Sequence, residues 1–92
     1  MNDVRAHVFV EGRVHGVFYR ASTCSKASLF SIKGWVRNCL DGRVEAVFEG
    51  TDDNVKKMIN WCRSGPPGAI VKSVDVKWEK AQGDETGFDV KY

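Results

Sequence analysis

Hydrophobic and polar positions alternate at the start of the chain and then change to a longer period. Residues 4–11 alternate, and one face of them consists of Val4, Ala6, Val8 and Val10. A period of two predicts a strand with one face in the core. From 19 to 30, four positions recur at helical spacing instead, namely Tyr19, Thr23, Ala27 and Phe30. We therefore expect a helix there, built partly from weak helix formers.

A second pair of strands follows this helix. Residues 32–40 alternate again and place on one face Ile32, Gly34, Val36 and Leu40. The pair Asp41-Gly42 is typical of a two-residue hairpin turn, because both residue types accept the left-handed backbone that such turns require. The strand after this turn ends at Gly50 and directs toward the core Val44, Ala46 and Phe48.

The clearest helical stripe precedes the sequence "GPPG" at 65–68, which ends it. It consists of Val55, Met58, Ile59 and Cys62, at positions i, i+3, i+4 and i+7. Thr51 or Asp52 is suited to cap this second helix. Two alternating runs come last, first Val74, Val76 and Trp78, and then Phe88 and Val90 after the loop "KAQGDETG".

The order strand–helix–strand–strand–helix–strand predicts a ferredoxin-like α+β sandwich. Two helices would cover one face of a four-stranded, mainly antiparallel sheet, with a short extra strand at the C-terminal end. The 92 residues suffice for one modest core, so we expect a single domain over 1–92. Because this scaffold hosts many activities, the fold alone does not define a function.

Composition and charge narrow the class of protein. The chain is 42% hydrophobic and 28% charged, as is usual for soluble globular proteins. No apolar run is long enough to span a bilayer and "MNDVRAHVFV" lacks a signal-peptide layout, so we expect a cytoplasmic protein that does not bind membranes. The net charge of +2 comes from scattered basic residues, which argues against a large nucleic-acid interface but allows one small anion site.

Three cysteines, Cys24, Cys39 and Cys62, match no metal-ligand spacing, and their odd number leaves at least one unpaired. We expect three free thiols in a reducing compartment, and no metal site. The two histidines, His7 and His15, form no nucleophile pattern with a cysteine, so a catalytic cysteine is not expected.

The stretch "EGRVHGVFYR" at 11–20 leaves the first strand, turns at Gly12 and Gly16, and enters the first helix. Such a loop exposes backbone N–H groups that suit a phosphate, although the glycines alone are more typical of an ordinary turn. Arg20 favours the anion site, because a cation near a helix N-terminus is disfavoured by about 0.3–1 kcal/mol unless an anion is bound there. An arginine that extends into solvent remains the alternative.

Asn38 lies near the end of the second strand, on the face of Ile32, Gly34 and Val36. An amide buried without partners costs about 1–3 kcal/mol, so this side chain needs an explanation. One interpretation is an asparagine satisfied by the backbone of the hairpin. The other is that its carbonyl oxygen holds a water molecule against an electrophile, close to the first loop.

Two longer motifs contain these residues and resemble the signatures of the acylphosphatase family. "GRVHGVFYR" at 12–20 is similar to Gly-Arg-Val-Gln-Gly-Val-x-Phe-Arg and departs from it at His15 and Tyr19. "GWVRNCLDGRVEAVFEG" at 34–50 fits the second signature throughout, and "WCRSGPPGAIVKSVDVKWE" resembles the family's second helix and fourth strand. Ser31 stands where relatives often have Gly.

The resemblance implies hydrolysis of small acyl phosphates to a carboxylate and inorganic phosphate, with no metal or cofactor. By position, the phosphoryl group would be held by the segment His15, Gly16, Val17, Phe18, Tyr19 and Arg20. Arg20 and Asn38 would be the catalytic residues, Asn38 by orienting the attacking water, and the substrate's own phosphate would accept the water's proton. Positioning and electrostatics would then supply most of the rate. We also expect a monomer.

Two other functions share this element order. An RNA-binding module would stack bases on aromatic residues of the third strand, but the outward residues there are Arg43, Glu45, Val47 and Glu49. A catalytically silent phosphate- or carbamoyl-phosphate-binding module is the second alternative. The presence of both Arg20 and Asn38 in a free-standing chain disfavours it, whereas the departures at His15 and Tyr19 keep it open.

Overall fold

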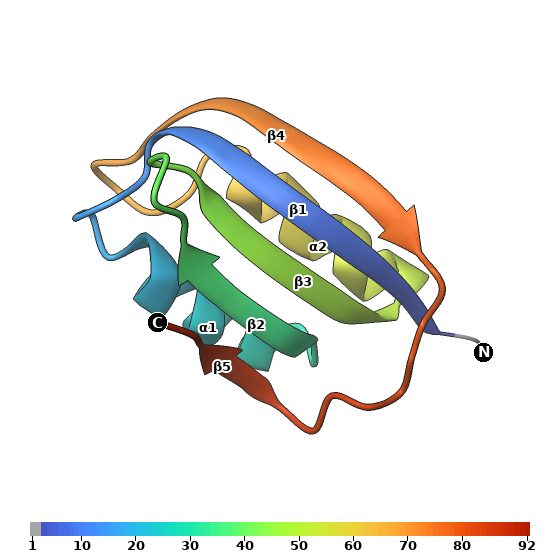
Figure 1. The fold of residues 1–92 in the computed structure, drawn as a ribbon. Helices are drawn as coiled ribbons and strands as arrows, with labels where there is room; N and C mark the ends of the chain where they lie inside the picture. Colours follow the sequence, from blue (N-terminus) through green and yellow to red (C-terminus); the bar gives the residue numbers. More distant parts are fainter. Residues whose placement is uncertain (1–2) are drawn as a thin grey trace.

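The computed structural model describes residues 3–92 as one sheet with two helices (Figure 1). Residues 1 and 2, which begin the segment considered above for a signal peptide, lie outside the described residues. The elements are β1 (Asp3–Arg13), α1 (Tyr19–Leu29), β2 (Lys33–Asn38), β3 (Val44–Thr51), α2 (Asp52–Cys62), β4 (Ile70–Glu79) and β5 (Phe88–Val90).

The strands form one sheet in the order β4-β1-β3-β2-β5. All neighbours pair antiparallel except β2 and β5, which run parallel. Both helices pack on the same face, α1 against β2 and β5 and α2 against β1 and β3 (Figure 1). The ferredoxin-like prediction is therefore confirmed, including the short extra strand.

The core lies between the sheet and the helices. It contains six of the inward residues predicted for β1 and β3, which are Ala6, Val8, Val10, Val44, Ala46 and Phe48, and the seventh, Val4, is partly buried against it. The whole predicted stripe of α2 is buried against them, and Thr51 caps that helix by accepting a hydrogen bond from the backbone N–H of Asn54 at 3.4 Å. Each large apolar side chain buried in this way contributes roughly 1.5–3 kcal/mol.

The second strand is shorter than its hydrophobic pattern predicted. β2 ends at Asn38, and Leu40 is fully exposed instead of sharing the inner face. The reason is the turn, which spans residues 39–43 instead of only Asp41 and Gly42. Within it the N–H of Cys39 donates to the carbonyl of Arg43 at 2.8 Å, and the N–H of Gly42 donates to the carbonyl of Cys39 at 3.2 Å. These bonds turn the chain before Leu40 reaches the sheet.

Three outward residues of β3 are buried although they lie on the sheet face that no helix covers. Glu45, Val47 and Glu49 are all buried, because β3 is the central strand and long side chains of its neighbours cover it. Arg5 bonds Glu49 at 3.1 Å, while His7 and Arg37 each bond Glu45 at 2.6 Å. The acidic residues of this face are thus held in ion pairs.

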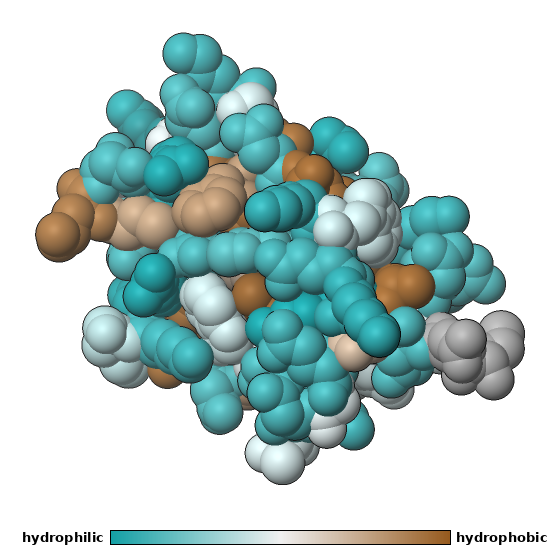
Figure 2. All heavy atoms as spheres, turned by 45° about the vertical axis from the view of Figure 1, so that its right-hand side comes forward, coloured by the Kyte–Doolittle hydropathy of each residue, from teal (hydrophilic) through white to brown (hydrophobic). Residues whose placement is uncertain are grey.

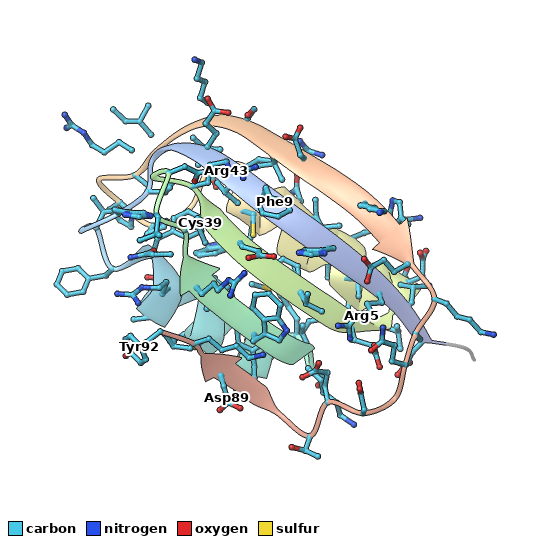
Figure 3. All side chains as sticks on the ribbon, in the orientation of Figure 1. Arg5, Phe9, Cys39, Arg43, Asp89 and Tyr92 are labelled. Carbon is cyan, nitrogen blue, oxygen red and sulfur yellow. The ribbon has the colours of Figure 1, made fainter. Side chains whose placement is uncertain are left out.

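Aromatic residues of this outer face come from β1 and β2. His7 stacks on Phe9 at 5.1 Å between ring centroids and meets the edge of Trp35 at 6.1 Å. Cationic side chains lie over the rings of Phe9 and Trp35. Arg43 lies 4.4 Å from the centroid of the Phe9 ring (Figure 3), and Lys91 lies 4.6 Å from the centroid of the Trp35 ring. These rings are therefore engaged within the protein.

Hydrophilic residues dominate the surface shown in Figure 2, and hydrophobic residues appear there in small separate groups. Within residues 3–92, neither helix has the length and apolar character needed to cross a bilayer.

Candidate functional site

The loop between β1 and α1 is fixed at both ends and irregular in the middle. A register shift between Glu11 and Gly12 interrupts the pairing of β1 with β4, which continues in the new register as far as Arg13. Gly12 has φ 136°, and a Cβ there would lie 2.1 Å from the carbonyl oxygen of Ile70, so only glycine fits. Val14 is buried just after it and anchors the start of the loop.

The middle of the loop presents free backbone donors. Within the described chain, no backbone N–H from His15 to Phe18 donates to another backbone carbonyl. Gly16 and Phe18 both have left-handed φ angles, 71° and 60°, and Phe18 is the N-cap residue of α1 without a side-chain cap bond. The loop and the uncapped first turn of α1 thus offer N–H groups and a positive helix end, which together suit an anion.

Arg20 lies in the first turn of α1, which contains no acidic residue. Its guanidinium carbon is 5.3 Å from the centroid of the Tyr92 ring. The positive charge therefore stands at the positive end of the helix dipole and lies over an aromatic ring, an arrangement that favours the binding of an anion.

Asn38 ends β2 beside this loop. β1 and β2 are both antiparallel to β3, so they run parallel to each other and their C-terminal ends lie at the same end of the sheet. The Asn38 carbonyl oxygen, Oδ1, is buried and has no hydrogen-bond partner among the described residues. Such an orphaned acceptor costs about 1–3 kcal/mol. Within the described residues, the hairpin backbone thus donates no hydrogen bond to this oxygen.

A pocket of about 310 Å³ joins these features. Its walls are formed by Val14, Gly16, Phe18, Tyr19, Arg20, Ala21, Asn38, Val90 and Tyr92. Of the residues singled out in the sequence, Gly16, Phe18, Tyr19, Arg20 and Asn38 are brought together here. The side chains of His15 and Val17 do not line it, and Val17 instead packs against the hydrophobic core.

Val90 and Tyr92 were not found by sequence analysis. The alternation at 88–90 predicted a strand but contains no sign of its partner. In the structure β5 pairs parallel with β2, with Val90 opposite Val36, and the N–H of Lys91 donates to the carbonyl of Val36 at 2.8 Å. This pairing brings Tyr92 to the edge of the pocket (Figure 3).

Glu49 holds the connection that leads to β5. Its carboxylate accepts the backbone N–H groups of Gln82 at 3.1 Å and Gly83 at 2.8 Å, besides the bond from Arg5. Burial alone would raise the pKa of Glu49, but these donors outweigh it and hold the pKa below its usual range. Glu49 thus stabilises the segment that carries one wall of the pocket.

Both departures from the family signature form polar contacts. The Tyr19 hydroxyl donates to the carbonyl of Cys62 at 2.8 Å inside the core, and burial raises the pKa of Tyr19. His15 Nε2 lies 3.0 Å from the carbonyl oxygen of Arg43. Each side chain therefore connects the loop region to a different part of the fold.

The thiols are not activated. All three cysteines are free. Burial, followed by the nearby charge of Glu45, raises the pKa of Cys39, and burial raises the pKa of Cys62 to about 12. Among residues 3–92, no three His, Cys, Asp or Glu side chains cluster as metal ligands would.

Comparison with known proteins identifies the family of the chain. The model of the acylphosphatase family matches residues 6–90. An acylphosphatase of Roseiflexus sp. (strain RS-1) is 56% identical over 90 residues, which is 98% of this chain and 97% of that protein. Among solved structures, the acylphosphatase of Coxiella burnetii aligns with a TM-score of 0.93 and 37% identity. This alignment covers 98% of this chain and 94% of the Coxiella burnetii chain. The acylphosphatase of Bacillus subtilis aligns with a TM-score of 0.93 and 28% identity, and the alignment covers 97% of this chain and 99% of the Bacillus subtilis chain.

Proposed function

Because this chain belongs to the acylphosphatase family, we propose that it hydrolyses small acyl phosphates by direct attack of water. Arg20 and the loop N–H groups hold the phosphoryl group, and Asn38 orients the water. The observation that carries this proposal is the buried, unpartnered Oδ1 of Asn38, which shares one pocket with Arg20. An acceptor left empty at such cost is explained by a ligand that donates to it.

The loop and Arg20 bind charge that develops in the transition state. The N–H groups from His15 to Arg20 surround the nonbridging phosphate oxygens, and the guanidinium of Arg20 forks onto two of them. Tyr92 supports the guanidinium from its ring face. These donors are in place before the reaction, so little reorganisation is needed as charge shifts during phosphoryl transfer.

Asn38 acts on the nucleophile. Its Oδ1 accepts a hydrogen bond from one O–H of a water molecule, which directs an oxygen lone pair at phosphorus. The new bond forms between this oxygen and phosphorus, and the bond from phosphorus to the carboxyl oxygen breaks opposite to it. The electron pair leaves with the carboxylate. The water proton that Asn38 does not bind passes to a phosphate oxygen of the substrate, and the other proton stays on the attacking oxygen.

The pocket supplies no separate general base. None of the side chains on its walls carries a carboxylate or an imidazole. The Tyr19 hydroxyl already donates to Cys62 and its raised pKa disfavours ionisation. A mechanism in which the substrate's phosphate accepts the water proton agrees with these wall residues. The proposed mechanism uses neither a metal nor a cofactor.

We further propose that 1–92 works as one domain and as a monomer in the cytoplasm. Arg20 and Asn38, to which the proposal assigns the chemistry, line the same pocket of one chain. Free thiols are usual in a reducing compartment. We expect no nucleic-acid partner, because the aromatic rings of the outer sheet face are already covered by Arg43 and Lys91.

The decisive experiment is hydrolysis of benzoyl phosphate and acetyl phosphate after exhaustive chelation. We expect turnover that is inhibited by inorganic phosphate and unaffected by EDTA. Full dependence on added Mg²⁺ would contradict the metal-free mechanism. Phosphate binding without any turnover would identify the silent binding module instead, and tight binding of single-stranded RNA would identify an RNA-binding module.

A further inference from the structure

His15 is bonded to the turn that follows Asn38. Its Nε2 lies 3.0 Å from the carbonyl oxygen of Arg43, and because a carbonyl only accepts, Nε2 must carry the hydrogen. An imidazole with a hydrogen on Nε2 makes this bond whether or not its other nitrogen is protonated. The side chain is thus directed away from the pocket and toward the β2–β3 hairpin.

The acceptor of this bond is shared with the residue next to Asn38. The Arg43 carbonyl also accepts the backbone N–H of Cys39 at 2.8 Å, and Cys39 directly follows Asn38. A carbonyl oxygen has two lone pairs and accommodates both donors. One oxygen atom therefore connects the phosphate-binding loop to the end of the strand that presents Asn38.

Several contacts hold the hairpin at Arg43. The Asp41 carboxylate accepts the backbone N–H of Arg43 at 3.1 Å and its Nε at 2.9 Å, and the Arg43 guanidinium lies over Phe9. Figure 3 shows Phe9, Cys39 and Arg43 close together at this end of the sheet. The loop, by contrast, makes no backbone hydrogen bond through its N–H groups from His15 to Phe18 within the described chain.

We propose that His15 is a positioning residue that sets the separation between the phosphate-gripping N–H groups and Asn38. This inference rests on the roles proposed above for the loop and Asn38. Without the tether, the loop and Arg20 still bind phosphate, but the phosphorus atom is no longer held in line with the water on Asn38. Because a misplacement of about 1 Å costs up to roughly 10²-fold in rate, turnover suffers more than binding.

The proposal also explains why a histidine is able to replace the glutamine of the signature at position 15. The glutamine in the signature that this segment resembles ends in an amide that donates N–H, as does the imidazole Nε2. Either side chain is able to reach a carbonyl acceptor, whereas an aliphatic one is not. The proposal therefore predicts that the donor, and not the ring or its charge, is what the position requires.

The test compares His15→Leu, which removes the donor, with His15→Gln, which keeps one. For His15→Leu we expect kcat with benzoyl phosphate to fall about tenfold while the inhibition constant of inorganic phosphate changes less than about twofold. His15→Gln should recover most of the lost turnover. An equal loss in both variants, or a parallel rise of the phosphate inhibition constant, would overturn the proposal.

A double-mutant cycle with Asn38→Ala tests whether His15 acts through Asn38. If it does, adding His15→Leu to Asn38→Ala should lower kcat by less than about twofold, because the alignment has already been lost. Independent, fully multiplicative effects of the two substitutions on kcat would contradict this.

An NMR titration with phosphate provides a readout without turnover. The NMR resonance of the Cys39 backbone amide should shift on phosphate binding in the wild type and in His15→Gln but not in His15→Leu. A shift in all three proteins would refute the proposed role of His15. A wild type that binds phosphate and transmits this shift but lacks turnover would refute the proposed function alone.

Discussion

The Tyr19 hydroxyl, in the first turn of α1, donates to the carbonyl of Cys62, the last residue of α2. This bond joins the ends of the two helices at the pocket side of α1. The Tyr19 ring is buried, packs against Trp61 at 5.6 Å between centroids, and would clash with any Cβ placed at Gly65. The start of α1 is thus fixed by a polar and an apolar contact together.

Tyr19→Phe should destabilise the fold by about 1–3 kcal/mol, since the buried Cys62 carbonyl loses its donor while the ring packing is kept. The free energy of unfolding is measured by urea denaturation. Tyr92→Phe is the matched control, because Tyr92 is fully exposed and its hydroxyl should not affect stability. An unchanged stability of Tyr19→Phe would mean that water or another group satisfies the carbonyl.

Arg20→Ala and Asn38→Ala should separate binding from turnover. Loss of Arg20 should raise both the inhibition constant of phosphate and KM, because the phosphoryl group loses a charged, forked donor. Loss of Asn38 should lower kcat about 10²–10³-fold with phosphate inhibition nearly retained, as expected of a group that acts mainly in the transition state. The exposed Arg63 and Asn60 supply matched controls, Arg63→Ala and Asn60→Ala. Indistinguishable effects of the two site variants on phosphate inhibition would refute the division of roles.

Glu49 should make the fold sensitive to acid. Its pKa is held below the usual range in the folded state, so the unfolded chain binds the proton more readily. Its contribution is therefore fully present above the ordinary glutamate pKa of about 4.3 and is lost as the pH falls through the lowered folded value. Urea midpoints between pH 3 and 7 should fall at the acid end in the wild type and less steeply in Glu49→Gln. Glu11→Gln, at an exposed position, should keep the wild-type slope.

Ser31 departs from glycine at a position that needs a left-handed backbone. Its φ is 55°, just after α1. A residue with a Cβ pays about 1–2 kcal/mol for this conformation, and the larger entropy of unfolded glycine offsets part of that cost. Ser31→Gly should therefore stabilise the protein by a few tenths to about 1 kcal/mol. Ser28→Gly, within the exposed face of α1, should instead destabilise it by roughly 0.5–1 kcal/mol. Equal signs for the two changes would refute the backbone argument.

Local patterns predicted the elements whose determinants lie close together in the sequence. The stripe from Val55 to Cys62 needs only helical periodicity, and all of it is buried. The alternation of hydrophobic and polar residues predicted the end of β2 wrongly, because the hydrogen bonds of the following turn end the strand earlier. Leu40 continued the alternation, but the hydrogen bonds of residues 39–43 end the strand at Asn38.

The candidate site was predictable as far as its residues lie in recognisable motifs. Arg20 and Asn38 stood out because their charge and polarity conflict with a purely structural role. Tyr92 and Val90 did not, since their part depends on a pairing between β5 and β2 that no local pattern encodes. The interaction of His15 with Arg43 is equally non-local.

The parallel pairing of β5 with β2 also bears on how the protein folds. Parallel strands pair only after a long connection has closed, and such distant contacts form slowly. The pocket unites Gly16 and Arg20 near one end of the chain with Val90 and Tyr92 at the other. During refolding we therefore expect helical circular dichroism to return before phosphate binding does. Catalytic competence would then be among the last properties that this chain acquires.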